Sequence, residues 1–258
     1  MIDDDEIERL RTLGLTDEAI GWEARRRRRD EPGEQDPTES GGTPVERATS
    51  EHAAAGGQWW SGYPIAYDVE YPEKLGRLST AFRAILAIPQ VLIVGGPGVG
   101  YGANSQTGLF GAVVAITSVV SWFAIMFTGR YPRGLWDMAM TYMRWRANVV
   151  TYAALLRDEY PPFGEGDYPA VFEMPYPEQS NRWTVGLRLI LVIPHFVVLF
   201  FVMLIWFATA VIAWFAILFT GRYPRGLFLF GVGAMRWSLR VQAYTYLMRD
   251  EYPPFSLT

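Results

Sequence analysis

The chain contains no cysteine among its 258 residues. This absence excludes a disulfide framework, a thiolate nucleophile and a cysteine-ligated metal site. Histidine is almost as rare, because only His52 and His195 occur, and no multi-histidine metal site is expected. A Gly-x-Ser-x-Gly sequence and a glycine-rich nucleotide loop are also missing. We therefore expect neither a metal nor a cofactor, and we do not expect an enzyme.

Charge is absent from two long stretches, residues 84–129 and 189–221, if His195 is counted as neutral. A single membrane-spanning helix needs about 20 apolar residues. The first stretch has room for two such helices, separated by a glycine-rich turn at 95–108. The second holds two short ones only if Arg182 and Arg188 reach the interface. The pattern predicts an integral membrane protein.

We expect no secretory signal either, because the chain opens on Asp3, Asp4, Asp5 and Glu6. Residues 1–58 carry a net charge of −7, whereas residues 59–258 carry +3. We interpret residues 1–29 as a short helical segment, closed by five arginines at 25–29, and residues 30–58 as a disordered linker. The segment is either a solvated tail, a module that docks a protein partner, or a clamp on anionic lipid. Nucleic acid is not an expected partner.

A duplication organises the rest of the chain. Residues 127–163 and 219–255 align without a gap, and 22 of 37 positions are identical. Each copy begins with Phe-Thr-Gly-Arg-Tyr-Pro-Arg-Gly and ends with Arg-Asp-Glu-Tyr-Pro-Pro-Phe. We therefore place two membrane repeats at 59–163 and 164–258.

Each repeat is predicted to be a transmembrane helical hairpin followed by an amphipathic interfacial helix. The expected hairpin helices are Leu78 to Val94 with Leu109 to Thr128, and Asn181 to Val202 with Leu204 to Thr220. Pro89 and Pro194 occupy matching places and should each kink or loosen the first helix of their hairpin. The predicted fold is thus an all-α integral membrane protein of two tandem pseudo-symmetric repeats.

The third helix of each repeat, 134–157 and 226–249, carries an arginine near its middle, Arg144 or Arg236. Because such arginines are costly inside a bilayer, we expect these helices to lie in the interface with Trp145 and Trp237 at headgroup depth. A helix that packs against the hairpin and covers its end is the alternative.

The basic residues flank the predicted hairpins, and the hairpin turns carry no charge. By the positive-inside rule, both flanks and both termini face the cytoplasm. Four spanning helices satisfy this rule. A third crossing in each repeat would place the two identical arginine motifs on opposite sides, against the rule.

The repeated motifs supply the candidate site residues. Six arginines are candidates for binding anionic lipid or a partner: Arg130, Arg133, Arg144, Arg222, Arg225 and Arg236. Four carboxylates are candidates for structural ion pairs: Asp158, Glu159, Asp250 and Glu251. We expect Arg133 or Arg144 to contact the first two carboxylates, and Arg225 or Arg236 to contact the last two. Acid–base catalysis by these groups is the alternative to a structural lock.

A second polar set lies on the first helix of each hairpin. Arg83 and Gln90 are seven residues apart, as are Arg188 and His195, so each pair shares one helical face. A polar stripe on a membrane helix should face the bundle interior or a water-filled cleft. It could relay protons or bind a headgroup, or it could be satisfied by neighbouring side chains.

The duplicated motifs behind apolar segments resemble a bacterial membrane family, widespread in actinobacteria, that is known only as a domain of unknown function. The resemblance covers about Tyr71 to Phe163 and Tyr176 to Phe255. It implies a multi-pass protein of the bacterial cytoplasmic membrane and brings no activity. We expect a non-catalytic scaffold or accessory subunit that binds partner proteins or anionic lipid. A small transporter or channel with a polar path between the repeats is the alternative.

Overall fold

The computed structural model describes residues 63–97 and 108–257. The predicted N-terminal segment, 1–29, and the predicted linker, 30–58, lie outside the described residues. The described part is mostly helical, with six helices and one pair of strands. Three helices, Arg77–Val94, Gly108–Thr128 and Ile193–Thr220, are long and apolar enough to cross a membrane. In this coarse form the predicted helical membrane protein is confirmed.

The first two helices, α4 (Arg77–Val94) and α5 (Gly108–Thr128), begin within one residue of the predicted bounds and end at them. Gly95 ends α4 with a φ of 84°, which is accessible to glycine without a steric cost. Pro89 lies inside α4 without ending it.

The second pair is divided elsewhere than predicted. The helices are α7 (Arg182–Leu191) and α8 (Ile193–Thr220), and the expected turn at Met203 lies inside α8. No glycine, proline or charge occurs between Phe196 and Thr220 to interrupt a helix. The chain bends at Val192 instead, two residues before Pro194, which lies in the first turn of α8, where its missing amide hydrogen costs no helical hydrogen bond.

Neither pair is a hairpin, so that part of the prediction is wrong. The amide of Val192 donates to Arg188 and the amide of Phe196 donates to Val192, so α7 and α8 form one bent helix. Its C-terminal end meets the segment before α4, because Leu75 N donates to Gly221 O at 2.9 Å. Its N-terminal end meets the end of α5 through a 2.9 Å bond from Ser180 N to Gly129 O.

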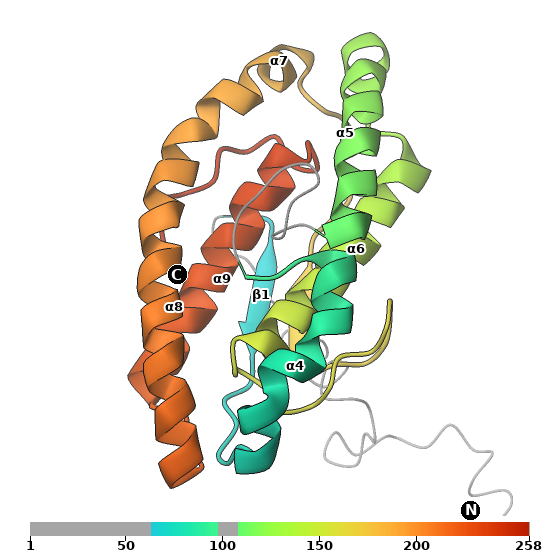
Figure 1. The fold of residues 1–258 in the computed structure, drawn as a ribbon. Coiled ribbons are helices and arrows are strands. Elements are labelled where there is room, and N and C mark those ends of the chain that lie inside the picture. The colour runs from blue at the N-terminus through green and yellow to red at the C-terminus, as the bar shows by residue number, and fades with distance from the viewer. Residues whose placement is uncertain (1–62, 98–107, 258) are drawn as a thin grey trace, which may run out of the picture. The chain divides into compact units, whose positions relative to one another are not determined.

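The start of α4 and the end of α5 therefore lie at opposite ends of the α7–α8 helix, as Figure 1 shows. Helix α5 continues in the direction of α4 and does not fold back on it. A glycine-rich connection permits a reversal of the chain but does not require one. The glycines therefore did not justify the predicted hairpin.

The third helices, α6 (Arg133–Ala153) and α9 (Arg225–Thr245), are largely buried against the other helices and the sheet. Helix α6 packs on α4 and α5, and α9 packs mainly on α8. Trp237 is 4% exposed, which contradicts its expected place among headgroups. Both helices thus cover their neighbours, as the alternative for these elements predicted.

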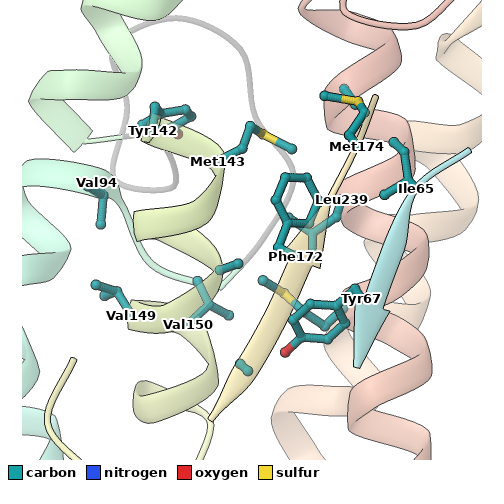
Figure 2. Packing of buried hydrophobic residues seen from close by; sticks show 14 of the residues in the cluster. Ile65, Tyr67, Val94, Tyr142, Met143, Val149, Val150, Phe172, Met174 and Leu239 are labelled. Atoms are coloured by element: carbon teal, nitrogen blue, oxygen red, sulfur yellow. The ribbon is translucent and has the colours of Figure 1, made fainter. Parts of the chain in front are cut away.

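Two short strands, β1 (Ala66–Val69) and β2 (Ala170–Glu173), pair antiparallel and were not predicted. Tyr67 lies opposite Phe172 in this ladder. Helix α6 contacts β2, and α9 contacts β1. Figure 2 shows the side chains of Tyr67 and Phe172 between α6, which carries Met143, and α9, which carries Leu239. The main hydrophobic core thus lies between these two helices and the sheet.

The other four helices bury only narrow faces. In α4 the buried positions are Thr80, Arg83, Ala87, Gln90 and Val94, which form one stripe at helical spacing. The remaining faces are exposed and apolar, with large side chains such as Phe123 and Phe215. Exposed apolar surface of this extent is typical of a membrane contact.

Candidate functional site

Arg83 is anchored by the end of its own repeat. Its side chain is 1% exposed and forms an ion pair with Asp158. A second nitrogen, Nη1, donates to the carbonyl oxygen of Arg157 at 2.9 Å, and the guanidinium lies 4.9 Å from the ring centroid of Tyr152. Asp158 also accepts a 3.0 Å bond from the amide of Gly76, just before α4. The carboxylate therefore serves both a buried arginine and a helix N-terminus.

Arg188 repeats this arrangement in α7. It pairs with Asp250, and its Nη1 donates to the carbonyl oxygen of Arg249 at 3.0 Å. The guanidinium lies over Tyr244, 5.4 Å from the ring centroid. Asp250 accepts from the amide of Asn181, the residue that caps α7. The two arrangements match residue by residue, as the sequence duplication leads one to expect.

Gln90 and His195, the other members of the polar stripe, are also enclosed. Trp145 donates its indole N–H to Gln90 Oε1 at 2.6 Å, and Gln90 Nε2 donates to the carbonyl oxygen of Pro161 at 2.6 Å. Trp237 Nε1 lies 3.3 Å from His195 Nδ1, and Phe255 stacks on the imidazole at 3.9 Å. Both residues are fully buried, so the stripe faces protein rather than a cleft.

The motif carboxylates take partners other than those expected. Arg83 and Arg188 hold Asp158 and Asp250, as described above. Glu159 pairs with Arg157 at 2.6 Å. Glu251 pairs in the same way with Arg249 at 2.7 Å. The predicted partners from the Gly-Arg-Tyr-Pro-Arg-Gly and Arg-Trp motifs were therefore wrong.

Arg144 and Arg236 reach across to the strand of the other repeat. Arg144 pairs with Glu173 at 3.0 Å. Arg236 pairs with Asp68 at 3.6 Å and donates through Nε to the carbonyl oxygen of Tyr67 at 3.0 Å. Neither arginine is free for a ligand without giving up these contacts.

Each Gly-Arg-Tyr-Pro-Arg-Gly turn also docks on the other repeat. Tyr71 donates its hydroxyl to the carbonyl oxygen of Tyr223 at 2.5 Å, and Arg225 lies 5.8 Å from the Tyr71 ring centroid. At the opposite end, Tyr176 donates to the carbonyl oxygen of Tyr131 at 2.5 Å. Arg133 lies 4.0 Å from the Tyr176 ring centroid. Two of the candidate arginines thus stabilise the contact between the repeats through cation–π interactions.

One open pocket of about 420 Å³ lies where the end of α8 meets the start of α4. It is lined by Lys74, Leu75, Arg77, Thr220, Gly221 and Arg222. Its three cations have no ion-pair partner within 63–97 and 108–257. We call these six residues the basic pocket.

The opposite end is built alike but carries less charge. Arg130 and Arg182 occupy the places of Arg222 and Arg77, and both are exposed. Gln179 stands where the basic pocket has Lys74. Lys74, Arg77 and Arg182 were not among the predicted binding residues, because they lie outside the motifs. Only the contact between repeats brings them to the motif arginines.

The described residues offer no group of His, Asp and Glu side chains that could hold a metal ion. Among the motif carboxylates, burial alone would raise the pKa of Glu159. Hydrogen bonds from Arg157 and from backbone amides, together with the positive charge of Arg157, outweigh this effect and hold that pKa below its ordinary value. Glu159 is thus an ion-paired carboxylate and not a group poised to transfer protons near neutral pH.

Comparison with known proteins gives one match. Residues 107–164 and 182–256 match a family described as a domain of unknown function, DUF4389. No curated protein and no solved structure matches the chain. The two matched segments contain both copies of the duplicated motifs, and together they cover just over half of the chain. The chain belongs to the DUF4389 family.

Proposed function

We propose that this chain is a non-catalytic membrane protein, a scaffold or accessory subunit that binds anionic phospholipid headgroups at the ends of its apolar helices. The proposal rests on a difference between two sets of cations, one paired with carboxylates and one without such partners. Arg83 and Arg188 are buried and committed to Asp158 and Asp250. Lys74, Arg77 and Arg222 line the basic pocket beside the apolar helices, where they have no acidic partner among the described residues.

Lipid phosphate is the ligand that this arrangement suits best. Arginine presents several donors in a fixed fork, which fits phosphate oxygens. Gly221 leaves the pocket open, since it lacks a side chain and adopts a φ of 72°. The ends of the apolar helices are also the places where headgroups would meet a membrane protein.

The polar stripe does not support the alternative function, a transporter or channel. A transport path would require a cleft lined by Arg83, Gln90, Arg188 and His195. All four are instead buried and bonded to the end of their own repeat or to a tryptophan. Catalysis by the motif carboxylates loses support in the same way.

Lipid binding to protein purified in a mild detergent tests the proposal. We expect phosphatidylglycerol to raise the melting temperature and to remain bound in native mass spectrometry, whereas phosphatidylcholine does neither. Arg222→Gln should weaken this binding. Arg144→Gln, which removes the same charge from a residue paired with Glu173, should leave it unchanged. Equal effects of the two lipids on the unaltered protein would refute the proposal.

A further inference from the structure

The two basic ends of the molecule pose a problem for a membrane-spanning arrangement. One end contains the basic pocket, and the other contains Arg130 and Arg182. The α7–α8 helix joins them and contains 39 residues. A straight helix of that length measures about 58 Å, and the hydrocarbon core of a bilayer is about 30 Å thick. A spanning orientation would also place the two basic motifs on opposite sides of the membrane.

The contacts between the repeats reveal how the ends are related. Leu75 bonds to Gly221 at one end, and their sequence equivalents, Ser180 and Gly129, bond at the other with the same 2.9 Å length. The bond from Tyr71 to Tyr223 recurs between Tyr176 and Tyr131. Reciprocal exchange of equivalent contacts is the signature of a two-fold relationship.

The strand register locates the axis of this relationship. Tyr67 and Phe172 are sequence equivalents, 105 positions apart like Arg83 and Arg188, and they face each other in the ladder. A two-fold axis passes between two equivalent residues that face each other. The sheet is therefore midway between the two basic ends.

Charged and accessible side chains surround this axis. Asp68 is 81% exposed, Glu173 48% and Arg144 40%. If the helices spanned a bilayer, the axis would lie in the membrane plane and these groups would lie at mid-depth. A charged side chain at the centre of a bilayer is costly even on the most permissive scale. An axis along the membrane normal avoids that cost and leaves both ends at one depth.

The apolar surface fits such an orientation. The exposed residues within 84–94, 108–128 and 189–220 include no charged side chain. Large apolar side chains are exposed along both helix pairs, among them Leu86, Phe123, Leu187, Phe201, Ile212 and Phe219. Tyr160, Phe163, Tyr252 and Phe255, from the ends of the two repeats, are exposed as well.

We infer that α4, α5, α7 and α8 lie within one leaflet, roughly parallel to the membrane plane, with the sheet and the basic ends on a single aqueous side. The occupant of the apolar surface is the acyl region of that leaflet. This inference rests on the proposed membrane function and replaces the four-crossing topology expected from the sequence. Interfacial helices insert about 5–10 Å into the headgroup and acyl boundary, and the wide exposed faces of these four favour the deeper end of that range.

Single-cysteine labelling of the full chain tests the orientation, and the chain needs no cysteine removed beforehand. Glu73→Cys and Glu178→Cys mark equivalent exposed positions at opposite ends, and Asp68→Cys marks the sheet. We expect a membrane-impermeant maleimide to label all three from the same side in intact cells or inverted vesicles. Labelling of Glu73→Cys and Glu178→Cys from opposite sides would overturn the inference.

Spin labels along α8 provide a second readout. Val197, Leu204, Ile212 and Phe219 are all exposed. An in-plane helix gives nitroxides at these positions similar depths by oxygen and nickel accessibility, whereas a spanning helix gives depths that change by about 1.5 Å per residue. Labels shielded from both reagents, together with a dimer in native mass spectrometry, would show a second copy on this surface and overturn the lipid assignment.

Release of the unaltered protein by alkaline carbonate would refute the membrane function itself. Retention in the membrane with opposite-side labelling would refute only the in-plane orientation. The two failures are therefore distinguishable.

Discussion

Arg188 and Asp250 form a partly buried ion pair that joins α7 to the end of the same repeat, 62 residues later in the chain. The guanidinium is fully buried, and it also donates to the carbonyl oxygen of Arg249 and to the hydroxyl of Thr184. The pair recurs as Arg83 and Asp158. The duplicated Arg-Asp-Glu-Tyr-Pro-Pro-Phe motif thus serves to anchor an arginine on an otherwise apolar helix, once in each repeat.

Loss of one member of this pair should destabilise the protein. Arg188→Met removes the ion-pair partner of the Asp250 carboxylate and the side-chain donor to the Arg249 carbonyl oxygen, and we expect a loss of about 3 kcal/mol in the free energy of unfolding. The double variant with Asp250→Asn should lose less than the sum of the two single losses. Arg144→Met, which breaks a half-exposed pair, should cost less than about 1 kcal/mol. Unfolding in detergent, followed by circular dichroism, measures all four; equal losses for Arg188→Met and Arg144→Met would contradict the anchoring role.

His195 should be replaceable by glutamine. Gln90 occupies the equivalent place and accepts from Trp145 as His195 does from Trp237. We expect His195→Gln to change stability by less than about 1 kcal/mol, whereas His195→Leu leaves a buried indole N–H unpaired and costs about 1–3 kcal/mol. Thermal unfolding of the two variants gives the comparison. If His195→Gln unfolds the protein as readily as His195→Leu, the acceptor role is refuted.

The tyrosines that join the repeats should contribute equally. Tyr71→Phe and Tyr176→Phe each remove one hydroxyl that donates to a carbonyl oxygen, at opposite ends of the molecule. We expect a loss of about 1 kcal/mol for each. The losses should add in the double variant, because the sites share no contacts. Strong non-additivity in denaturant titrations would show that the two ends are coupled.

Replacement of glycine should destabilise the protein at both motif turns, but more at one turn than at the other. Gly129 and Gly221 both have a φ of 72°, so alanine is strained by about 1–2 kcal/mol at either site. A Cβ at Gly129 would lie 3.0 Å from Arg182 Nε, whereas one at Gly221 would lie 3.7 Å from Arg77 Nε. We therefore expect Gly129→Ala to lower the melting temperature more than Gly221→Ala. The reverse order would show that Arg182 moves away at little cost.

Acid should weaken the fold partly through Glu159. Because its pKa in the folded protein is below the ordinary value of 4.5, its ionised form stabilises the fold above that value. This stabilisation is lost as the pH falls through the lowered pKa. Glu159→Gln should therefore have a smaller decrease in melting temperature below about pH 4.5 than the unaltered protein. Identical acid profiles of the two proteins would exclude this contribution.

Local features of the fold were predictable from the sequence. The bounds of α4 and α5 follow from uncharged apolar runs that end at glycine and at the Gly-Arg-Tyr-Pro-Arg-Gly turn. The shared face of Arg83 and Gln90 follows from helical spacing, and both are buried on it. Such features depend on residues within a few turns of one another, which sequence patterns report directly.

The direction of the chain after α4 and the partners of the motif residues were not predictable in this way. The glycines at 95–108 allow either a reversal or a continuation, and contacts with α7 and α8 select continuation. Asp158 pairs with Arg83, 75 residues earlier in the sequence, rather than with the nearer Arg133 or Arg144. Charge matching is satisfied by several partners, and only packing chooses among them.

The sequence by itself thus determined a duplicated, largely helical membrane protein with basic residues flanking apolar segments, because composition and helical period act locally. Only the tertiary structure decided that the first segment of each repeat packs against the other repeat. As a result, the basic ends lie far apart and the paired strands lie between them. The physical reason is that these exchanged contacts, such as Leu75 with Gly221, join residues distant in the chain. Their free energy depends on the packing of both repeats at once.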